Sequence, residues 1–219
     1  MSLAQLKHNS IGVISLLVGF TLLALSIWLY GELAASRRVA ELATGGSVCK
    51  GTTISRVAKT LRQQPRPVAW SGLKAFIRCQ FPTVPQMTTA ELAALLPTDS
   101  ASLPTGDSAP LKIQLLDTRT KAEFAVSHLP GAIHVPDLAA AQAADLNPNV
   151  LTIAYCSVGY RSAKLVEQLA AAGFQNVVNL EGSLFEWANE GRLMIHTGQA
   201  TRAVHPFNES WGWFLEPTP

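Results

Sequence analysis

Short apolar runs alternate with helical patterns over residues 112–191, and this alternation limits the possible fold more than any other feature of the sequence. Three runs are continuous enough for strands that are buried on both faces, namely KIQLLD (112–117), VLTIAY (150–155) and NVVNL (176–180). A shorter strand is expected at 131–136, and helices are expected at 88–96, from 120, at 161–173 and at 183–191. Strands that alternate with helices predict an α/β domain with a mostly parallel sheet.

A run of uncharged residues, IGVISLLVGFTLLALSIWLY, occupies positions 11–30. At about 1.5 Å per residue, a helix of this length spans roughly 30 Å, the thickness of the hydrocarbon core of a bilayer. A buried core helix and a cleaved signal peptide are the alternatives, but the run is long for a signal peptide and no clean A-x-A site follows it. We therefore expect an uncleaved transmembrane helix at 11–30, preceded by an N-terminal tail at 1–10.

The net charge of +2 hides a regional asymmetry. Residues 31–86 carry nine Lys/Arg and two Glu, a net +7, whereas residues 87–219 carry seven Lys/Arg and thirteen Asp/Glu, a net −6. Arg37, Arg38 and Lys50 follow the apolar run, and only Lys7 precedes it. The positive-inside rule therefore predicts a single-pass membrane protein whose N-terminus lies outside and whose larger part is cytoplasmic.

The basic segment 31–86 contains two amphipathic helical patterns. Their apolar faces consist of Ile54, Val57, Ala58 and Leu61 in the first, and of Trp70, Leu73, Phe76 and Ile77 in the second. Basic amphipathic helices beside a membrane span favour a position on an anionic membrane surface. A helical cap on the acidic domain is the alternative, and both stay open. PTVPQ (82–86) is expected to be a linker, and the absence of a nucleic-acid-binding motif predicts no nucleic acid partner.

Cys156 lies where the apolar run 150–155 ends. Ligands of an open α/β sheet bind beyond the carboxyl ends of its strands. The following residues, Ser157, Val158, Gly159, Tyr160 and Arg161, enter a helix whose N-terminal N–H groups favour negative charge. Gly159 permits a tight turn and Arg161 adds a permanent positive charge. We therefore expect Cys156 to have a lowered pKa and to be a nucleophile, although a buried, inert cysteine is the common alternative.

Three stretches of the chain together resemble a single-domain rhodanese. They are LLDTRTKAEFAVSHLPGAIHVP (115–136), YCSVGYRSAKLVEQLAAAGF (155–174) and VVNLEGSLFEWANEG (177–191). The resemblance implies a rhodanese-like α/β fold for residues 87–194, with a mostly parallel sheet flanked by helices. The transmembrane helix and the short amphipathic helices would precede this domain, and a C-terminal tail at 195–219 would follow it.

The resemblance implies an enzyme that transfers sulfur through a persulfide on Cys156. The donor would be thiosulfate or a persulfide, and the acceptor would be cyanide or a thiol, including a protein thiol. The loop N–H groups and Arg161 would stabilise the persulfide anion, and Asp117 and Arg119 would brace the loop through an ion pair. His128 would belong to the scaffold. No cofactor is expected, and no Cys/His cluster has the spacing of a zinc site.

Two positions depart from the family pattern. Two-domain thiosulfate sulfurtransferases carry a substrate-binding arginine where this chain has Glu123, which weakens the case for thiosulfate as the natural donor. The usual Gly-Gly before the last helix is Gly182-Ser183 here, and we expect this change to be neutral.

Two other functions compete with sulfur transfer. A Cdc25-like phosphatase or an arsenate reductase would need the longer C-x5-R loop, whereas Cys156 and Arg161 form C-x4-R. A non-catalytic, membrane-tethered docking module is disfavoured by the intact Cys-Gly-Arg loop. The three cysteines are too few for a disulfide framework. Cys49 and Cys79 are expected to be ordinary residues and not sulfur relays.

Overall fold

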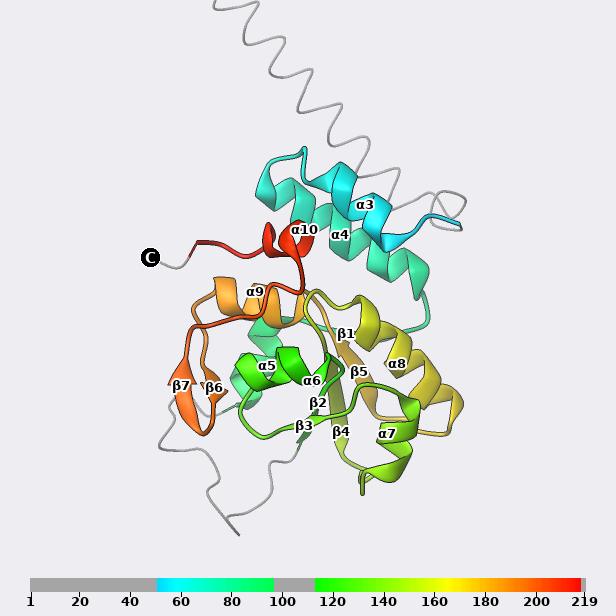
Figure 1. The fold of residues 1–219 in the computed structure, drawn as a ribbon. Coiled ribbons are helices and arrows are strands. Elements are labelled where there is room, and N and C mark those ends of the chain that lie inside the picture. The colour runs from blue at the N-terminus through cyan, green and yellow to red at the C-terminus, as the bar shows by residue number, and fades with distance from the viewer. Residues whose placement is uncertain (1–50, 97–112, 218–219) are drawn as a thin grey trace, which may run out of the picture.

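The computed structural model describes residues 51–96 and 113–217 (Figure 1). The expected tail at 1–10, the expected transmembrane helix at 11–30 and the part of the basic segment before residue 51 lie outside these ranges. Within the described ranges, no helix has both the length and the apolar character needed to cross a membrane.

A five-stranded sheet in the order β1-β5-β4-β2-β3 forms the centre of the molecule, and every pair of neighbouring strands is parallel. The strands are β1 (Gln86–Met87), β2 (Ile113–Asp117), β3 (Ala132–His134), β4 (Leu151–Tyr155) and β5 (Val177–Leu180). The four strands predicted from the apolar patterns are present with shifts of one or two residues at their ends. The expected parallel α/β architecture is confirmed.

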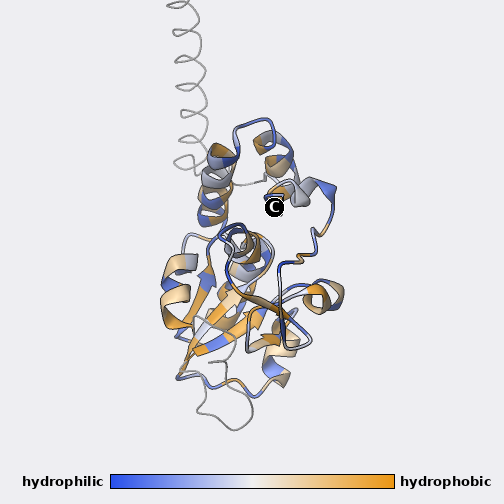
Figure 2. Ribbon diagram, turned by 90° about the vertical axis from the view of Figure 1, so that its left-hand side faces the viewer, coloured by the Kyte–Doolittle hydropathy of each residue, from blue (hydrophilic) through white to orange (hydrophobic). Residues whose placement is uncertain are grey.

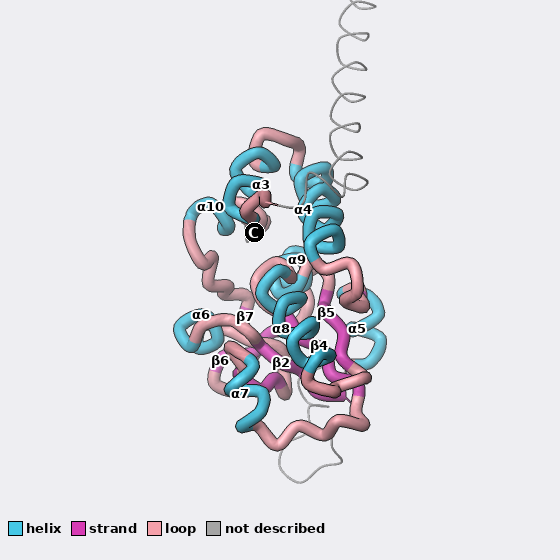
Figure 3. Tube along the Cα trace, turned by 90° about the vertical axis from the view of Figure 1, so that its right-hand side faces the viewer, coloured by secondary structure: helices cyan, strands magenta, loops and turns pink. Residues whose placement is uncertain are grey.

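Helices cover both faces of this sheet (Figures 1 and 3). One face packs against α7 (Leu138–Ala143) and α8 (Tyr160–Ala171), and the other against α5 (Thr89–Leu95) and α9 (Ser183–Asn189). Adjacent residues of β2 show the alternation, because Leu116 belongs to the first core cluster and Leu115 to the second. The strands are largely hydrophobic in Figure 2, as strands covered on both faces should be.

Helix α6 (Lys121–Val126) follows β2 and begins at a capping box. The Thr120 hydroxyl accepts a hydrogen bond from the Glu123 N–H, and the Glu123 carboxylate accepts one from the Thr120 N–H. The predicted start of this helix is confirmed. The box also fixes Glu123 beside the carboxyl end of β2, where it becomes part of the site described below.

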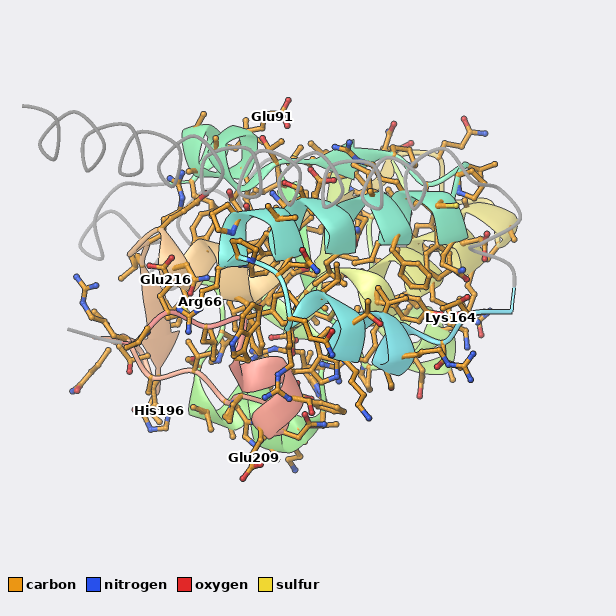
Figure 4. The ribbon with its side chains drawn as sticks, turned by 90° about the horizontal axis from the view of Figure 1, so that it is seen from above. Arg66, Glu91, Lys164, His196, Glu209 and Glu216 are labelled. Atoms are coloured by element: carbon orange, nitrogen blue, oxygen red, sulfur yellow. The ribbon has the colours of Figure 1, made fainter. Side chains whose placement is uncertain are left out.

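Three helices form a cap over the carboxyl end of the sheet. We define the cap as α3 (Ile54–Leu61), α4 (Arg66–Gln80) and the tail segment 204–215 with α10 (Glu209–Gly212). Figure 4 looks down on this cap, where α3 lies between α4 and α10. The Trp70 and Phe214 rings meet at 5.3 Å, which joins α4 to the tail. Lys74 of α4 forms an ion pair of 2.5 Å with Glu186 of α9, which joins the cap to the domain.

The apolar faces of α3 and α4 are buried in the same core cluster as α8. Of the two alternatives for these basic helices, the structure therefore has the intramolecular cap, and the apolar faces are not free to contact a membrane. The exposed Arg56, Lys59 and Arg62 lie on the opposite side of α3.

The interpretation of residues 82–86 as a linker is wrong at its C-terminal end. Gln86 begins β1 and pairs with Asn179 of β5, so the sheet starts one residue before the expected domain boundary at 87. Val84 is buried in the core, which holds the preceding residues in place. A strand of two residues is too short to produce a recognisable alternation in the sequence.

The tail contains a small hairpin that the sequence did not predict. Strands β6 (Met194–His196) and β7 (Gln199–Thr201) pair antiparallel, and His128 forms an isolated bridge to Ile195. Cys79, in the last turn of α4, is disulfide-bonded. It is not a free thiol, so the expectation that it is an ordinary residue is wrong, and a single cysteine with no local motif gave no sign of this bond.

Candidate functional site

The loop after β4 wraps around the sulfur atom of Cys156. The Gly159 N–H group donates a hydrogen bond to Cys156 Sγ at 3.1 Å. Gly159 has φ of +103°, a left-handed conformation that residues with a Cβ rarely adopt. The Cys156 N–H group donates to the Ser183 hydroxyl at 3.1 Å, which fixes the start of the loop. The predicted nucleophile therefore lies at the carboxyl end of the central strand, in a loop that turns an N–H group toward it.

The surroundings of Cys156 favour the thiolate. Burial raises the pKa of the Cys156 thiol, but the charge of Arg161 and hydrogen bonds from Ser162 and Gly159 lower it, and the result is a pKa below the ordinary cysteine value. Because the thiolate is the reactive form, these contacts favour nucleophilic chemistry at Cys156. The lowered pKa expected from the sequence agrees with these contacts.

Arg161 is held by Glu123, a partner that was not predicted from the sequence. Its two terminal nitrogens donate to the two carboxylate oxygens of Glu123 at 2.9 and 2.7 Å, and one of them also reaches the Ser157 hydroxyl at 3.0 Å. Burial raises the pKa of Glu123, but hydrogen bonds from Arg161 and Thr120 bring it down to about 2. Glu123 is therefore ionised at neutral pH and balances the charge of Arg161.

The predicted ion pair between Asp117 and Arg119 is present and fully buried. Arg119 Nε and Nη2 donate to the Asp117 carboxylate at 2.9 and 2.6 Å, and Nη2 also donates to the Ser127 carbonyl oxygen. The Arg119 guanidinium lies 5.9 Å from the ring of Tyr155, the residue before Cys156. This pair stabilises the ends of β2 and β4 without contacting the sulfur atom.

A buried polar chain behind Cys156 was not foreseen. The Asn179 amide donates to Gln86 at 2.7 Å, and the Ser162 hydroxyl donates to Asn179 at 2.6 Å. Ser183 adopts φ of +53° and donates its hydroxyl to the Leu180 carbonyl oxygen at 2.9 Å while accepting the Cys156 N–H. The change from Gly to Ser at position 183 therefore adds a contact to the loop, whereas no effect was expected from the sequence.

Val158 and Tyr160 connect the loop to the cap. Val158 is buried in the core cluster, and the Tyr160 ring packs at 5.2 Å against Phe81 and at 6.5 Å against Phe76. The side chains of these two loop residues, which were predicted to belong to the anion-binding loop, act by packing.

The comparisons with known proteins agree with this geometry. A family model described as a rhodanese-like domain matches residues 104–190. A sulfurtransferase from Allochromatium vinosum is 31% identical over 84 residues, which cover 38% of this chain and 78% of that protein. Thiosulfate sulfurtransferase 16, chloroplastic, from Arabidopsis thaliana is 35% identical over 89 residues, which cover 35% of this chain and 74% of that protein. The chain belongs to the rhodanese-like family.

A solved rhodanese-like domain protein from Staphylococcus aureus shares 31% identity with this chain, with a TM-score of 0.40. That match covers 52% of this chain and 99% of the other. In two other curated relatives the match is less complete, and the chain spans only 51% and 20% of their length. The homology to sulfurtransferases is therefore distant and partial, and it covers the rhodanese-like domain but not the cap.

His128 of the rhodanese-like domain lies away from the sulfur. Its ring stacks on Phe124 at 4.0 Å, and its Nδ1 atom lies 3.0 Å from the Phe124 carbonyl oxygen. Its backbone pairs with Ile195 of the tail hairpin. These contacts are those of a scaffold residue, as expected.

A cavity of about 180 Å³ lies over Cys156. The loop supplies its floor, α3 contributes Ile54, and the tail contributes Phe207 and Trp211. A larger cavity of about 890 Å³ lies elsewhere, between α9 and the tail, where Arg66 and Glu216 are labelled in Figure 4. Its described lining contains no cysteine, serine or histidine, so the smaller cavity is the candidate site for nucleophilic chemistry.

Proposed function

We propose that the chain is a rhodanese-type sulfurtransferase that carries sulfane sulfur as a persulfide on Cys156. The observation that carries this proposal is the hydrogen bond from the Gly159 N–H group to Cys156 Sγ at 3.1 Å, in a loop that also holds Arg161 close by. A persulfide carries its negative charge on the outer sulfur, beyond Sγ, and the nearby positive charge of Arg161 would stabilise it there. The names of the related sulfurtransferases support the same chemistry.

The proposed reaction has two displacement steps. The Cys156 thiolate attacks the outer sulfur of the donor, the donor's sulfur–sulfur bond breaks, and the donor leaves with the electron pair, as sulfite from thiosulfate or as a thiolate from a persulfide. A cyanide or thiolate acceptor, including a protein thiol, then attacks the outer sulfur of the Cys156 persulfide. This step regenerates the thiolate, and the cycle needs no cofactor and no external oxidant.

The lowered pKa and the cavity favour this reaction over a docking role without catalysis. A protein-docking module would need neither a stabilised thiolate nor space above the sulfur atom. The loop has the C-x4-R spacing and not the C-x5-R spacing that a Cdc25-like phosphatase would need. Its arginine is also paired with Glu123, so neither feature favours a phosphatase.

Persulfide formation tests the proposal directly. The full chain, purified in detergent, is incubated with thiosulfate or with a low-molecular-mass persulfide, alkylated, digested and examined by mass spectrometry. We expect added sulfur on the peptide that contains Cys156 and none in Cys156→Ser, with circular dichroism showing that the variant is folded. No added sulfur with either donor, or turnover retained by Cys156→Ser, would rule the proposal out.

We also propose that residues 11–30 anchor the enzyme in a membrane, on the support of their hydropathy alone.

Two indicators of the orientation of this anchor in the membrane disagree. Arg37, Arg38 and Lys50 favour a cytoplasmic domain, whereas a disulfide-bonded Cys79 favours an oxidising compartment. Protease added outside intact cells decides between them. Protection of the C-terminus supports the cytoplasmic orientation, and digestion overturns it.

A further inference from the structure

The walls of the cavity over Cys156 come from parts of the chain that the family match does not cover. The match ends at residue 190 and begins at 104, whereas Ile54 and Ser55 come from α3, and Phe207 and Trp211 come from the tail. The cap that carries these residues lies over the carboxyl end of the sheet in Figure 1. The reactive loop therefore lies within the family match, and the residues that enclose it from α3 and the tail lie outside it.

The positive charge that lines the cavity is already paired. Among the described residues that line it, Arg161 is the one basic side chain, and both of its terminal nitrogens are taken by Glu123. The Phe207 ring lies 5.0 Å from the Arg161 guanidinium and covers it from the tail side. A dianion that entered this cavity would lose its hydrating water, and no unpaired cation would compensate for the cost of that desolvation.

Phe207 has an unusual backbone conformation. Its φ is +63°, in the left-handed region that is costly for a residue with a Cβ. Such conformations persist where the surrounding structure imposes them, and they cluster at functional sites. The ring of Phe207, a residue that is 45% exposed, lies over Arg161 and forms one wall of the cavity.

The size of the cavity limits what can fill it. Its volume of about 180 Å³ is small beside the ~300–1,000 Å³ of typical ligand pockets. An apolar cavity of ~150 Å³ in another protein holds one benzene molecule. A single ring or a short alkyl chain therefore suits the space between Ile54, Phe207 and Trp211.

We propose that this cavity selects sulfur donors that carry a small apolar group beside the sulfane sulfur and at most one negative charge, with Phe207 and Trp211 as specificity-determining residues. This inference rests on the sulfurtransferase function proposed above. An aryl thiosulfonate represents the donor class. The Cys156 thiolate attacks its terminal sulfur, the bond to the sulfonyl sulfur breaks, and the donor leaves as an aryl sulfinate with the electron pair.

A pair of donors tests the selectivity. The full chain in detergent is assayed for thiocyanate formation from cyanide, with benzenethiosulfonate or thiosulfate as the donor, and the ratio of the two kcat/KM values is recorded. We expect this ratio to favour benzenethiosulfonate and to fall about 2- to 12-fold in Phe207→Ala and in Trp211→Ala, the range expected for loss of one aromatic contact. The change between variants is independent of the intrinsic reactivity of either donor.

Matched control variants distinguish an effect of the aromatic wall from a general effect of substitution. Trp213→Ala removes an aromatic ring of the same tail that does not line the cavity, so its ratio should equal that of the unaltered chain. Glu123→Gln should raise kcat/KM for thiosulfate relative to benzenethiosulfonate, because it leaves Arg161 unbalanced. Glu91→Gln is its control, since Glu91 occupies the corresponding place in the exposed capping box of α5.

The outcomes separate this inference from the function on which it rests. A preference for thiosulfate, or an unchanged ratio in both Phe207→Ala and Trp211→Ala, would overturn the selectivity while leaving sulfur transfer intact. Absence of thiocyanate and of a Cys156 persulfide with both donors would overturn the sulfurtransferase function itself.

Discussion

The thiol of Cys156 is almost completely buried, with 1% of its residue surface exposed, and yet its pKa lies below the ordinary value. Burial alone would favour the neutral thiol. The contacts that reverse this effect are the charge of Arg161 and the hydrogen bonds from Ser162 and Gly159. The reactivity of the cysteine therefore depends on a few named neighbours.

Arg161→Gln should raise the pKa of Cys156. The thiolate forms as the pH rises through the thiol pKa, so the alkylation rate of Cys156 should reach its plateau at a higher pH in the variant. At a pH below both midpoints, a thiol pKa that is higher by one makes the thiolate, and hence the rate, about tenfold lower. The measurement is the pH profile of iodoacetamide labelling at Cys156 by mass spectrometry.

Lys164→Gln is the control for this profile, because Lys164 is an exposed basic residue on the same helix. It should leave the midpoint unchanged. An identical midpoint in Arg161→Gln and the unaltered chain would show that Arg161 does not stabilise the thiolate.

The buried pair of Asp117 and Arg119 should matter for stability. Arg119→Met keeps an unbranched apolar stem but removes the guanidinium, so the Asp117 carboxylate is left buried without its partner, which costs about 3–5 kcal/mol. Arg192→Met, which removes a partly exposed pair with Glu190, should cost less than about 1 kcal/mol. Urea unfolding measures both, and equal losses would contradict the bracing role of Arg119.

Part of the site was predictable from neighbouring residues. The order Cys156, Gly159, Arg161 after an apolar run indicated the loop, and Thr120 with Glu123 indicated the start of α6. The contact between Glu123 and Arg161 joins residues 38 positions apart, so no local pattern contains it. One feature of the sequence did point to this contact. Glu123 and Arg161 each follow the carboxyl end of a predicted strand, and these strands, β2 and β4, are neighbours in the sheet.

Helix α8 depends on the conformation of its first turn. Gly159 precedes it with φ of +103°, and a Cβ there would approach Asn179 and the Leu180 carbonyl oxygen at 3.4 Å. Gly159→Ala should therefore destabilise the fold by about 1–2 kcal/mol and also displace the N–H group that contacts Cys156. We expect a strong loss of sulfur transfer, measured as thiocyanate formation.

Gly173, just beyond the other end of α8, supplies the matched control. It has φ of +99°, and a Cβ there would meet open space. Gly173→Ala should lose a similar amount of stability and keep its turnover. If both variants lost activity equally, strain and not loop geometry would explain the effect.

The elements themselves were predictable to different degrees. The long apolar and amphipathic runs located β2, β4, β5 and α8 within two residues or so of their ends. The two- and three-residue strands β1, β6 and β7 are too short to carry a period. For α3 and α4 the pattern indicated an apolar face but not what covers it, because membrane and protein core both bury apolar surface.

At the scale of the whole molecule, the cap is part of the core. Phe214 of the tail is fully buried among Trp70, Trp211 and Trp213. Phe214→Ala should destabilise the protein by about 3–5 kcal/mol, as deletion of a buried aromatic side chain usually does. Phe207→Ala, at a residue 45% exposed, should cost far less. Thermal unfolding measures both variants, and a single transition of unchanged midpoint in Phe214→Ala would show that the cap is dispensable.

The position of Phe207 in the chain also determines when, during protein synthesis, the tail wall of the cavity over Cys156 can form. Phe207 and Trp211 are synthesised after Cys156, and at ~5–20 residues per second the ribosome needs roughly 3–10 s to reach them. During that interval the nascent chain carries Cys156 while the tail wall does not yet exist. Selectivity among donors would thus be acquired last, after the loop that performs the chemistry has been made.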